Sequence, residues 1–169
     1  MKPGAPFPMP LGVEAVRELL YREAYLLDRH LFDDWLALYT EDATYWLPLE
    51  HHQADPVNTS SIIYDDRRLM ELRVKQASHP RAHARVPAAR TVHQVGNVLI
   101  TMPAGEAGEG EVLVASTLML TEFRAERQRM YAALVEHRLR LTAAGWKIAA
   151  KRVDLINSEG ELDGIAVIF

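Results

Sequence analysis

The chain has 169 residues, which is long enough for one domain to bury a hydrophobic core without disulfides or structural metals. Its composition is ordinary for a globular protein, and its formal net charge of -4 argues against a nucleic-acid backbone as a partner. It contains no cysteine, which excludes disulfides, thiolate nucleophiles and a cysteine-ligated iron–sulfur cluster in this chain. No apolar run has the length of a signal peptide or a membrane span, so we expect a cytoplasmic protein without membrane contact.

The first twelve residues form a proline-rich arm, which we separate from a single predicted domain over 13–169. Four of the first ten residues are proline, and this density excludes a helix there. From Val13 onward, apolar residues recur at intervals of three and four, and this spacing predicts a helix over about 13–30. The stretch "DDWLALY" predicts a shorter helix over 33–39.

Short strands are predicted over 43–47, within "EDATYWLP", and over 60–64, within "SSIIY". The second strand leads into "DDRRLMELRV", which has helical spacing. Asp65 stands at the expected N-cap, and Asp66 lies in the first turn near the positive end of the helix dipole. We interpret the two aspartates as helix-starting residues; the alternative is a metal clamp or an acid/base pair.

Four long runs with alternating polarity predict an antiparallel meander joined by short turns. These runs cover 90–103, 111–125, 127–142 and 145–157. The tail "ELDGIAVIF" is a candidate for one more extended piece. Because the helices come first and the strands follow, the predicted class is α+β, with the helices covering one face of a long curved sheet.

The seven histidines suggest no metal site by their spacing. His79 and His83 are four residues apart, as a helical zinc pair requires, but Pro80 lies between them and opposes a continuous helix. No phosphate-binding loop or serine-nucleophile motif is present. His137 falls on the apolar face of its strand, where we interpret it as a buried histidine with one hydrogen bond, since no acidic partner lies on the same face of that strand. A general base in a pocket is the alternative.

Several segments together resemble one known family. The segments "YREAYLLDRHLFDDWLALYTEDATYWLP" (21–48), "IYDDRRLMELRV" (63–74), "RTVHQVGNV" (90–98) and "GWKIAAKRVDLIN" (145–157) resemble the small, or β, subunit of aromatic-ring-hydroxylating dioxygenases. The resemblance runs in order over most of 13–169. It implies a cone-shaped α+β fold like that of nuclear transport factor 2 (NTF2), which SnoaL-type cyclases and scytalone dehydratase share.

The resemblance also implies partners and cofactors outside this chain. A large α subunit is expected to carry the Rieske [2Fe-2S] cluster and the mononuclear Fe(II), with three large and three small subunits in a hexamer. The assembled enzyme is expected to cis-dihydroxylate an arene or aromatic acid with oxygen and NAD(P)H through a separate electron-transfer chain. This chain is then a structural subunit with no catalytic, cofactor-binding or metal-binding residue of its own.

Two other interpretations stay open. In the first, the chain is a stand-alone isomerase or dehydratase on the same fold, with a pocket inside the cone. Its conceivable acid/base groups are Tyr25, Asp28, Tyr45 and His93. In the second, it is a homo-oligomeric scaffold without a dioxygenase partner.

Two surfaces are predicted to make contacts. The basic loop 78–90 is expected to dock on the large subunit, because arginine suits carboxylates at interfaces and two prolines stiffen the loop. Its basic residues are Arg81, Arg85 and Arg90, with His79 and His83. The meander and the tail are expected to join three copies, because the strand over 111–125 is apolar on both sides.

Overall fold

The computed structural model describes residues 12–78, 87–102, 108–160, 162 and 164–169. All but one residue of the proline-rich arm, and the basic residues of the loop before Arg90, lie outside these ranges. Within them the chain forms three helices and six strands. They are α1 (Val13–Asp28), α2 (Phe32–Ala37), β1 (Tyr39–Pro48), β2 (Ser61–Asp66), α3 (Arg67–Ser78), β3 (Arg90–Met102), β4 (Glu111–Arg124), β5 (Arg127–Thr142) and β6 (Gly145–Leu155).

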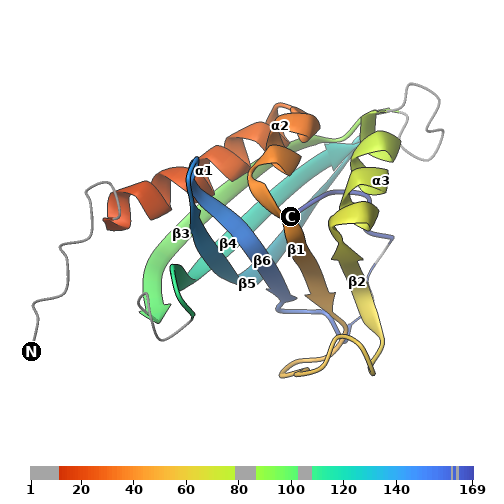
Figure 1. The fold of residues 1–169 in the computed structure, drawn as a ribbon. Coiled ribbons are helices and arrows are strands. Elements are labelled where there is room, and N and C mark those ends of the chain that lie inside the picture. Colours follow the sequence, from red (N-terminus) through yellow and green to blue (C-terminus); the bar gives the residue numbers. More distant parts are fainter. Residues whose placement is uncertain (1–11, 79–86, 103–107, 161, 163) are drawn as a thin grey trace, which may run out of the picture.

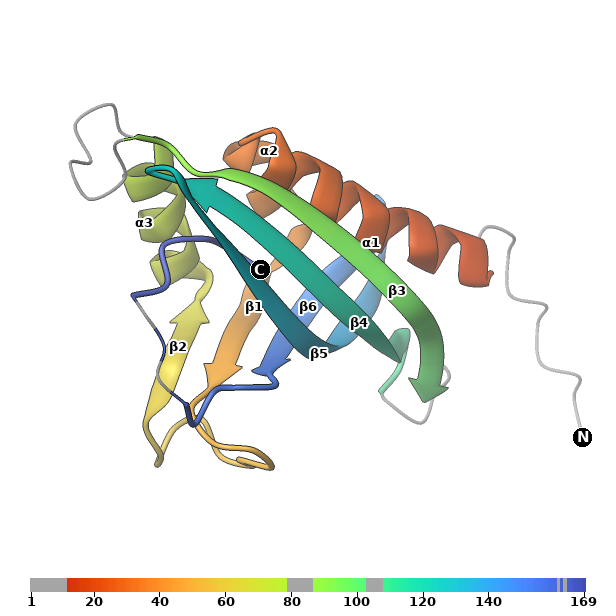
Figure 2. The same ribbon diagram turned by 180° about the vertical axis from the view of Figure 1, so that it is seen from behind.

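The strands make one mixed sheet in the order β2-β1-β6-β5-β4-β3. Strands β3 to β6 pair antiparallel with their neighbours in sequence, which confirms the predicted meander. Strand β1 pairs parallel with β6 and antiparallel with β2, so the first two strands extend the sheet on the β6 side. Figures 1 and 2 show α1 lying across the long strands, with α2 and α3 nearer to β1 and β2. The predicted α+β class is confirmed.

The first helix buries an apolar stripe whose members include Val16, Leu20 and Leu27. The helix ends two residues earlier than the spacing predicts. The reason is His30, which adopts a left-handed backbone conformation with φ of 57°. The Leu31 amide then donates to the Leu26 carbonyl at 2.9 Å, a bond typical of a terminated helix.

Strand β1 begins earlier than the sequence predicts, at Tyr39 rather than at residue 43. Tertiary pairing explains the difference, because Tyr39 lies opposite Ile148 of β6 and the Ile148 amide donates to the Leu38 carbonyl at 2.9 Å. Helix α2 correspondingly ends at Ala37, two residues before the predicted end.

The two adjacent aspartates have different roles, and the assignment of Asp65 as the cap is wrong. Strand β2 continues through Asp66, so the helix begins one residue later, and Asp66 Oδ1 accepts the Leu69 amide at 2.9 Å. Asp65 lies within the strand opposite Tyr45, is buried, and forms an ion pair with Arg73 at 2.6 Å. Neighbouring residues in a strand point to opposite faces, so the two carboxylates do not converge on one ion.

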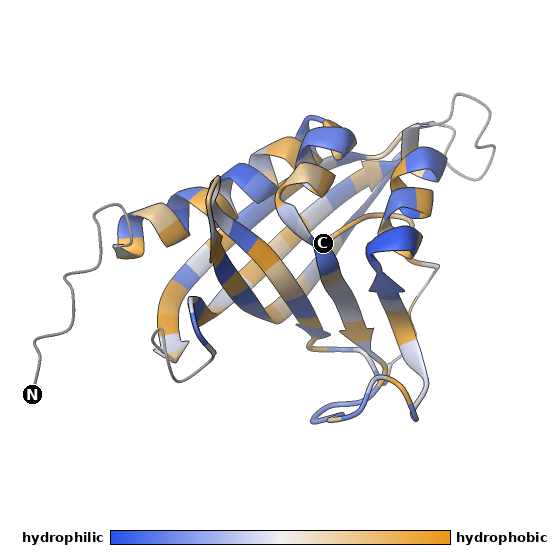
Figure 3. Cartoon of the chain, viewed as in Figure 1, coloured by the Kyte–Doolittle hydropathy of each residue, from blue (hydrophilic) through white to orange (hydrophobic). Residues whose placement is uncertain are grey.

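The two faces of the sheet differ in exposure. On β4, the inner residues, among them Val114 and Leu120, are fully buried under the helices. The outer residues Met119 and Phe123 are exposed. Figure 3 shows hydrophobic and hydrophilic residues following one another along the long strands. The outer face of β3, β4 and β5 thus carries an apolar patch, here called the outer patch, made of Val92, Leu99, Met119, Phe123, Met130 and Leu134.

The described residues of the tail, 162 and 164–169, add no strand to the sheet. Its last residues, Val167, Ile168 and Phe169, fold back and are buried in the core. They therefore pack inside their own chain.

Candidate functional site

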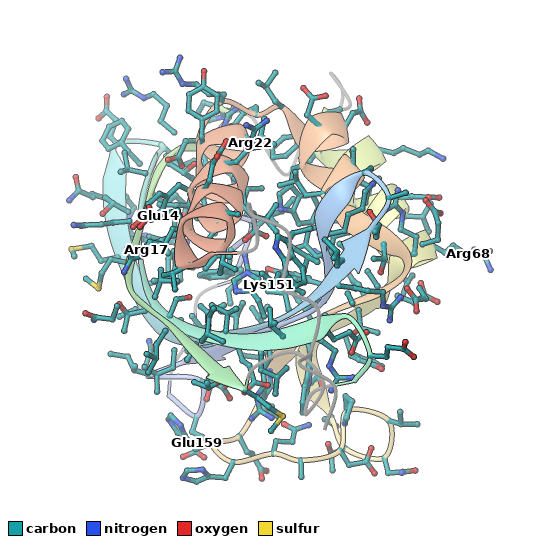
Figure 4. All side chains as sticks on the ribbon, turned by 60° about the vertical axis from the view of Figure 1, so that its left-hand side comes forward. Glu14, Arg17, Arg22, Arg68, Lys151 and Glu159 are labelled. Carbon is teal, nitrogen blue, oxygen red and sulfur yellow. The ribbon has the colours of Figure 1, made fainter. Side chains whose placement is uncertain are left out.

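A charged cluster lies inside the cone, between α1 and the sheet. Its centre is Glu23, which is 3% exposed and projects from the apolar face of α1. Glu23 Oε1 accepts hydrogen bonds from Tyr39 OH at 2.6 Å and Trp35 Nε1 at 3.2 Å. Lys151 Nζ lies 2.8 Å from the same oxygen, and His137 Nε2 lies 3.1 Å from Oε2. Figure 4 shows Lys151 in the interior enclosed by the helix and the curved sheet.

The charges in this cluster depend on one another. Burial alone would raise the pKa of Glu23, but the Lys151 ammonium and the His137 hydrogen bond overcome it and hold that pKa well below its usual range. Burial lowers the pKa of Lys151 and of His137, and Glu23 opposes both shifts. Burial, with the neighbouring Glu23 charge, raises the pKa of the Tyr39 hydroxyl. The stable arrangement is therefore one carboxylate and one ammonium with a neutral imidazole beside them.

The prediction for His137, a buried histidine with a single hydrogen bond, is confirmed. The reason given for it was incomplete, because the acidic partner comes from α1 and not from the strand. Since Glu23 accepts, Nε2 carries the proton and Nδ1 is an acceptor. Among the described residues, no group donates to that Nδ1.

The tail reaches this cluster through Phe169. Lys151 Nζ donates to the Phe169 backbone oxygen at 2.6 Å, and the Phe169 amide donates to Tyr45 OH at 3.0 Å. The Phe169 ring packs edge-on against Tyr131, with 5.3 Å between ring centroids. The ring is fully buried, so it is part of the core beside the cluster's partner strand β5.

A second carboxylate–histidine pair joins the end of α1 to β3. His93 Nδ1 lies 2.6 Å from Asp28 Oδ1, and the His93 amide donates to the same carboxylate. His93 Nε2 lies 2.9 Å from the Ile168 carbonyl. Burial would raise the pKa of Asp28, but the hydrogen bonds from His93 and Thr91 lower it. The pair thus fastens the tail to the sheet.

The four candidate pocket residues occupy different places. Asp28 and His93 form the pair just described, and Tyr45 and His93 contact consecutive tail residues. Tyr25 is exposed on the outer side of α1, with the Arg29 guanidinium 5.0 Å from its ring centroid. The structure therefore does not bring Tyr25 into the interior with the other three.

Sequence reasoning missed Glu23, Tyr39 and Lys151. A signal for two of them was present, because Glu23 falls on the apolar stripe of its helix and Lys151 falls on the inner face of its strand. Charged residues are rarely buried unless they are paired, so two opposite charges at such positions indicate an internal ion pair.

Of the predicted docking residues, Arg81, His83 and Arg85 lie outside the described residues. Arg90 is described, and it begins β3 with its guanidinium 4.9 Å from the centroid of the Phe123 ring.

An open groove of about 890 Å³ runs along the outer side of α1, where Figure 4 labels Glu14, Arg17 and Arg22.

The described residues contain no group of three or more histidine, aspartate or glutamate side chains arranged to hold a metal ion. A Rieske cluster needs two cysteines, so this chain, which has none, does not fit that cofactor. In the part of the chain that the structure describes, no helix combines the length and apolar character needed to cross a bilayer.

Comparison with known proteins agrees with this architecture. The family model described as "Ring hydroxylating beta subunit" matches residues 22–159. The small oxygenase component of the p-cumate 2,3-dioxygenase system of Pseudomonas putida is 34% identical over 139 residues, covering 81% of this chain and 75% of the relative.

Two solved structures share this fold. The β subunit of benzoate 1,2-dioxygenase from Burkholderia mallei superposes with a TM-score of 0.72 at 29% identity, covering 90% of this chain and 95% of the other. An NTF2-like protein with a cystatin-like fold from Novosphingobium aromaticivorans has a TM-score of 0.60 at 16% identity, covering 85% and 81%. The predicted NTF2-like fold is confirmed, and the chain belongs to the ring hydroxylating beta subunit family.

Proposed function

We propose that this chain is the structural, non-catalytic β subunit of a dioxygenase that cis-dihydroxylates an arene or aromatic acid in aromatic-compound catabolism. The observation that carries the proposal is the family match over 22–159. The relatives' names, among them p-cumate 2,3-dioxygenase, benzoate 1,2-dioxygenase and benzene 1,2-dioxygenase, support an arene or aromatic acid as the substrate class. The interior is consistent with a structural role, because Glu23 and Lys151 are engaged by partners of their own chain.

The catalytic groups belong to a large α subunit in this proposal. That subunit holds the Rieske cluster and the mononuclear iron, and it works with NAD(P)H through a separate electron-transfer chain. Three α and three β subunits form the complete particle in the cytoplasm. The absence of cysteine from this chain supports the division of labour, because the cluster ligands must then come from another polypeptide.

The outer patch joins three β subunits in this proposal. Met130 and Leu134 of β5 are 62% and 61% exposed and lie opposite Thr121 and Thr117 of β4. An apolar area of this kind on a folded monomer is typical of an interaction surface. A closed threefold arrangement buries one patch per copy and leaves no open end for further growth.

The arginine-rich loop contacts the large subunit in this proposal, through Arg81, His83, Arg85 and Arg90. Arg90 supports it, because its guanidinium lies over the Phe123 ring, 4.9 Å from the ring centroid, at the start of β3. A planar cation on an aromatic ring, with nitrogens left to bind carboxylates, suits a protein interface.

Co-expression with the large subunit tests the proposal. We expect the two chains to co-purify, arene turnover to require both, and the isolated β chain to contain no stoichiometric iron. Arg81→Glu with Arg85→Glu should weaken co-purification at moderate salt while circular dichroism and the trimeric mass of the β chain stay unchanged. Turnover of an arene by the large subunit alone at the full rate would contradict a structural requirement for this chain. Turnover of a small cyclic substrate by the β chain alone would favour the stand-alone enzyme.

A further inference from the structure

The outer side of α1 carries two tyrosines that folding leaves half exposed. Tyr21 and Tyr25 are 50% and 54% exposed, and they lie one helical turn apart on the same side of the helix. Both line the open groove of about 890 Å³ along this helix, here called the α1 groove, whose lining runs from Glu14 to Leu26 and includes Asp34 of α2. Neighbouring exposed aromatic rings in a groove are typical of a surface that contacts another segment of polypeptide.

We propose that the α1 groove binds the proline-rich arm of its own chain, which turns back at the start of α1 and runs along the helix towards α2. The groove itself consists of described residues. Residues 1–11 lie outside the described residues, and what supports the proposal is their sequence, their length and the place where they join α1. The contact is separate from the proposed assembly with a large subunit and does not depend on it.

The composition of the arm suits an aromatic groove. Pro3 and Pro6 stand three residues apart. A polyproline II helix completes one turn in that distance, so in this conformation both proline rings face the same side. Segments with this spacing dock in aromatic-lined grooves, and they lose little entropy because the polyproline conformation is largely formed before docking. Tyr21 and Tyr25 supply two aromatic rings on one side of α1.

The arm joins α1 where the groove begins. Gly12 is the N-cap in an extended conformation, and Figure 1 shows that α1 starts at its end remote from α2. Pro10 and Gly12 stand at the second and fourth places of a four-residue stretch, where a type I turn favours proline and glycine. The helix rises about 18 Å between Glu14 and Leu26. Residues 1–8 in polyproline geometry span about 25 Å, so they are long enough to cover the groove after such a turn.

Charge favours this direction along the groove. Lys2 is the only charged residue among residues 1–11. An arm that turns back at Gly12 brings Lys2 to the α2 end of the groove, where the exposed Asp34 forms part of the lining. The two arginines of the lining each pair with a glutamate of α1, at 3.1 and 2.8 Å, so their positive charge is already balanced. The tether gives a high effective concentration, which favours the chain's own arm over that of another copy.

A spin label tests the contact in the full-length chain. The sequence contains no cysteine, so Ala5→Cys provides one defined attachment site within the arm. We expect a nitroxide there to broaden the amide NMR signals of Tyr21 and Tyr25 more strongly than that of Glu14. A label on an undocked arm would give the reverse order, since Glu14 lies nearest to the point where the arm joins the helix.

The control for the position of the label is Val57→Cys. Val57 is 74% exposed in the loop after β1, whereas α2 lies before β1, so this label stands at the opposite end of that strand from the groove. It should broaden neither tyrosine signal.

Two pairs of substitutions remove the contact from either side. Tyr21→Ser with Tyr25→Ser deletes both rings and should lower the ratio of docked to undocked arm about tenfold or more, since each aromatic contact contributes a factor of roughly two to ten. Pro3→Ser with Pro6→Ser leaves the groove intact and should also give the undocked order of broadening. Tyr64→Ser, at an exposed tyrosine of β2, is the matched control and should leave the pattern unchanged. Circular dichroism confirms that each variant is folded.

A mixed sample identifies which chain supplies the arm. Nitroxide-labelled chains without isotope and isotope-labelled chains without nitroxide are unfolded together in urea and refolded, so that any oligomer contains both. We expect no broadening, because each groove holds the arm of its own chain. Broadening in the mixture would place the arm of a second copy in the groove and overturn the proposal.

Two further results would overturn it. One is the undocked order of broadening in the chain with an unchanged groove, and the other is undiminished broadening after loss of both tyrosines. Neither measurement involves a large subunit, so a failure to co-purify with that subunit would count against the assembly proposal alone.

Discussion

Each face of the sheet carries some side chains that depart from the usual distribution. On the inner face, His137 and Lys151 are buried to within a few per cent. On the outer face of the same β5, Met130 and Leu134 are largely exposed. Charged groups are normally outside and large apolar groups inside, so each face needs a specific explanation.

The two faces differ in which groups contact their unusual side chains. The charges inside are satisfied by residues of the same chain, because α1 supplies Glu23 and the tail supplies the backbone oxygen of Phe169. The apolar groups outside have no covering element among the described residues. Folding of the chain therefore buries the inner face. In our proposal, association with other subunits buries the outer face.

Among the substitutions considered, Lys151→Met on the inner face should cause the largest loss of folding free energy. The substitution retains the length of the side chain but leaves the Glu23 carboxylate buried without its cation. Removing one partner of a buried ion pair costs about 3–5 kcal/mol of folding free energy. Urea denaturation of the two proteins measures the loss.

The matched control for this prediction is Lys75→Met on the exposed side of α3, which should change stability by less than about 0.5 kcal/mol. A loss below about 1 kcal/mol for Lys151→Met would show that the ammonium does not balance Glu23.

The outer face is tested by Leu134→Glu. A charge at the centre of the outer patch should separate the proposed trimer into monomers while the circular dichroism spectrum stays native. Full burial of one leucine contributes about 1.5–3 kcal/mol, so association should weaken at least about tenfold. Light scattering at micromolar concentration gives the mass.

Val57→Glu is the control for this prediction, because Val57 is 74% exposed in the loop between β1 and β2 and far from the patch in sequence. It should leave the mass unchanged. A trimer that survives Leu134→Glu would move the contact to another surface.

Acidification should lower the folding stability of the chain through protonation of His137 and Glu23 on the inner side of the sheet. The folded pKa of His137 is below its usual 6.5, so the unfolded chain binds the proton first as the pH falls, and stability declines from about pH 6.5 downward. The folded pKa of Glu23 is below its usual 4.5, so its contribution is fully present above pH 4.5 and is lost below it. Each pKa unit of displacement corresponds to about 1.4 kcal/mol.

The measurement is the urea midpoint at pH 7.5, 6.0 and 5.0. In His137→Gln, the side-chain amide retains a donor for Glu23 but does not titrate, so the decline between pH 7.5 and 5.0 should become flatter. An unchanged pH profile in that variant would assign the acid sensitivity to other groups.

The smallest expected effect lies away from both faces, at the start of α3. Asp66→Ala removes the cap that accepts the Leu69 amide and should cost about 1 kcal/mol. Asp66→Asn keeps a capping oxygen and should restore most of that stability. A larger loss of folding free energy for Asp66→Ala than for Lys151→Met would show that the helix cap matters more to stability than the buried ion pair.

Much of the fold is encoded in local patterns. The period of the apolar residues predicts α1 and the four strands of the meander, because a helix and a strand each repeat over a few residues. Because the sequence contains no cysteine, it shows without a structure that this chain does not hold a Rieske cluster. The alternation of residues in β4 also predicts that its outer face is apolar. It does not identify the protein surface that covers this face.

Tertiary structure decided the details that depend on distant partners. Asp66 rather than Asp65 caps α3, because pairing with β1 extends β2 by one residue beyond the point where local preference would start a helix. Glu23 and His137 are 114 residues apart in sequence, and only the packing of α1 on the sheet brings them together. The sequence makes the tail a candidate for one more extended piece, and the structure shows that side chains of the sheet hold its last residue. The local spacing of apolar residues determines which helices and strands form. Contacts between buried charged residues depend on how those elements pack, and no short stretch of the chain contains this information.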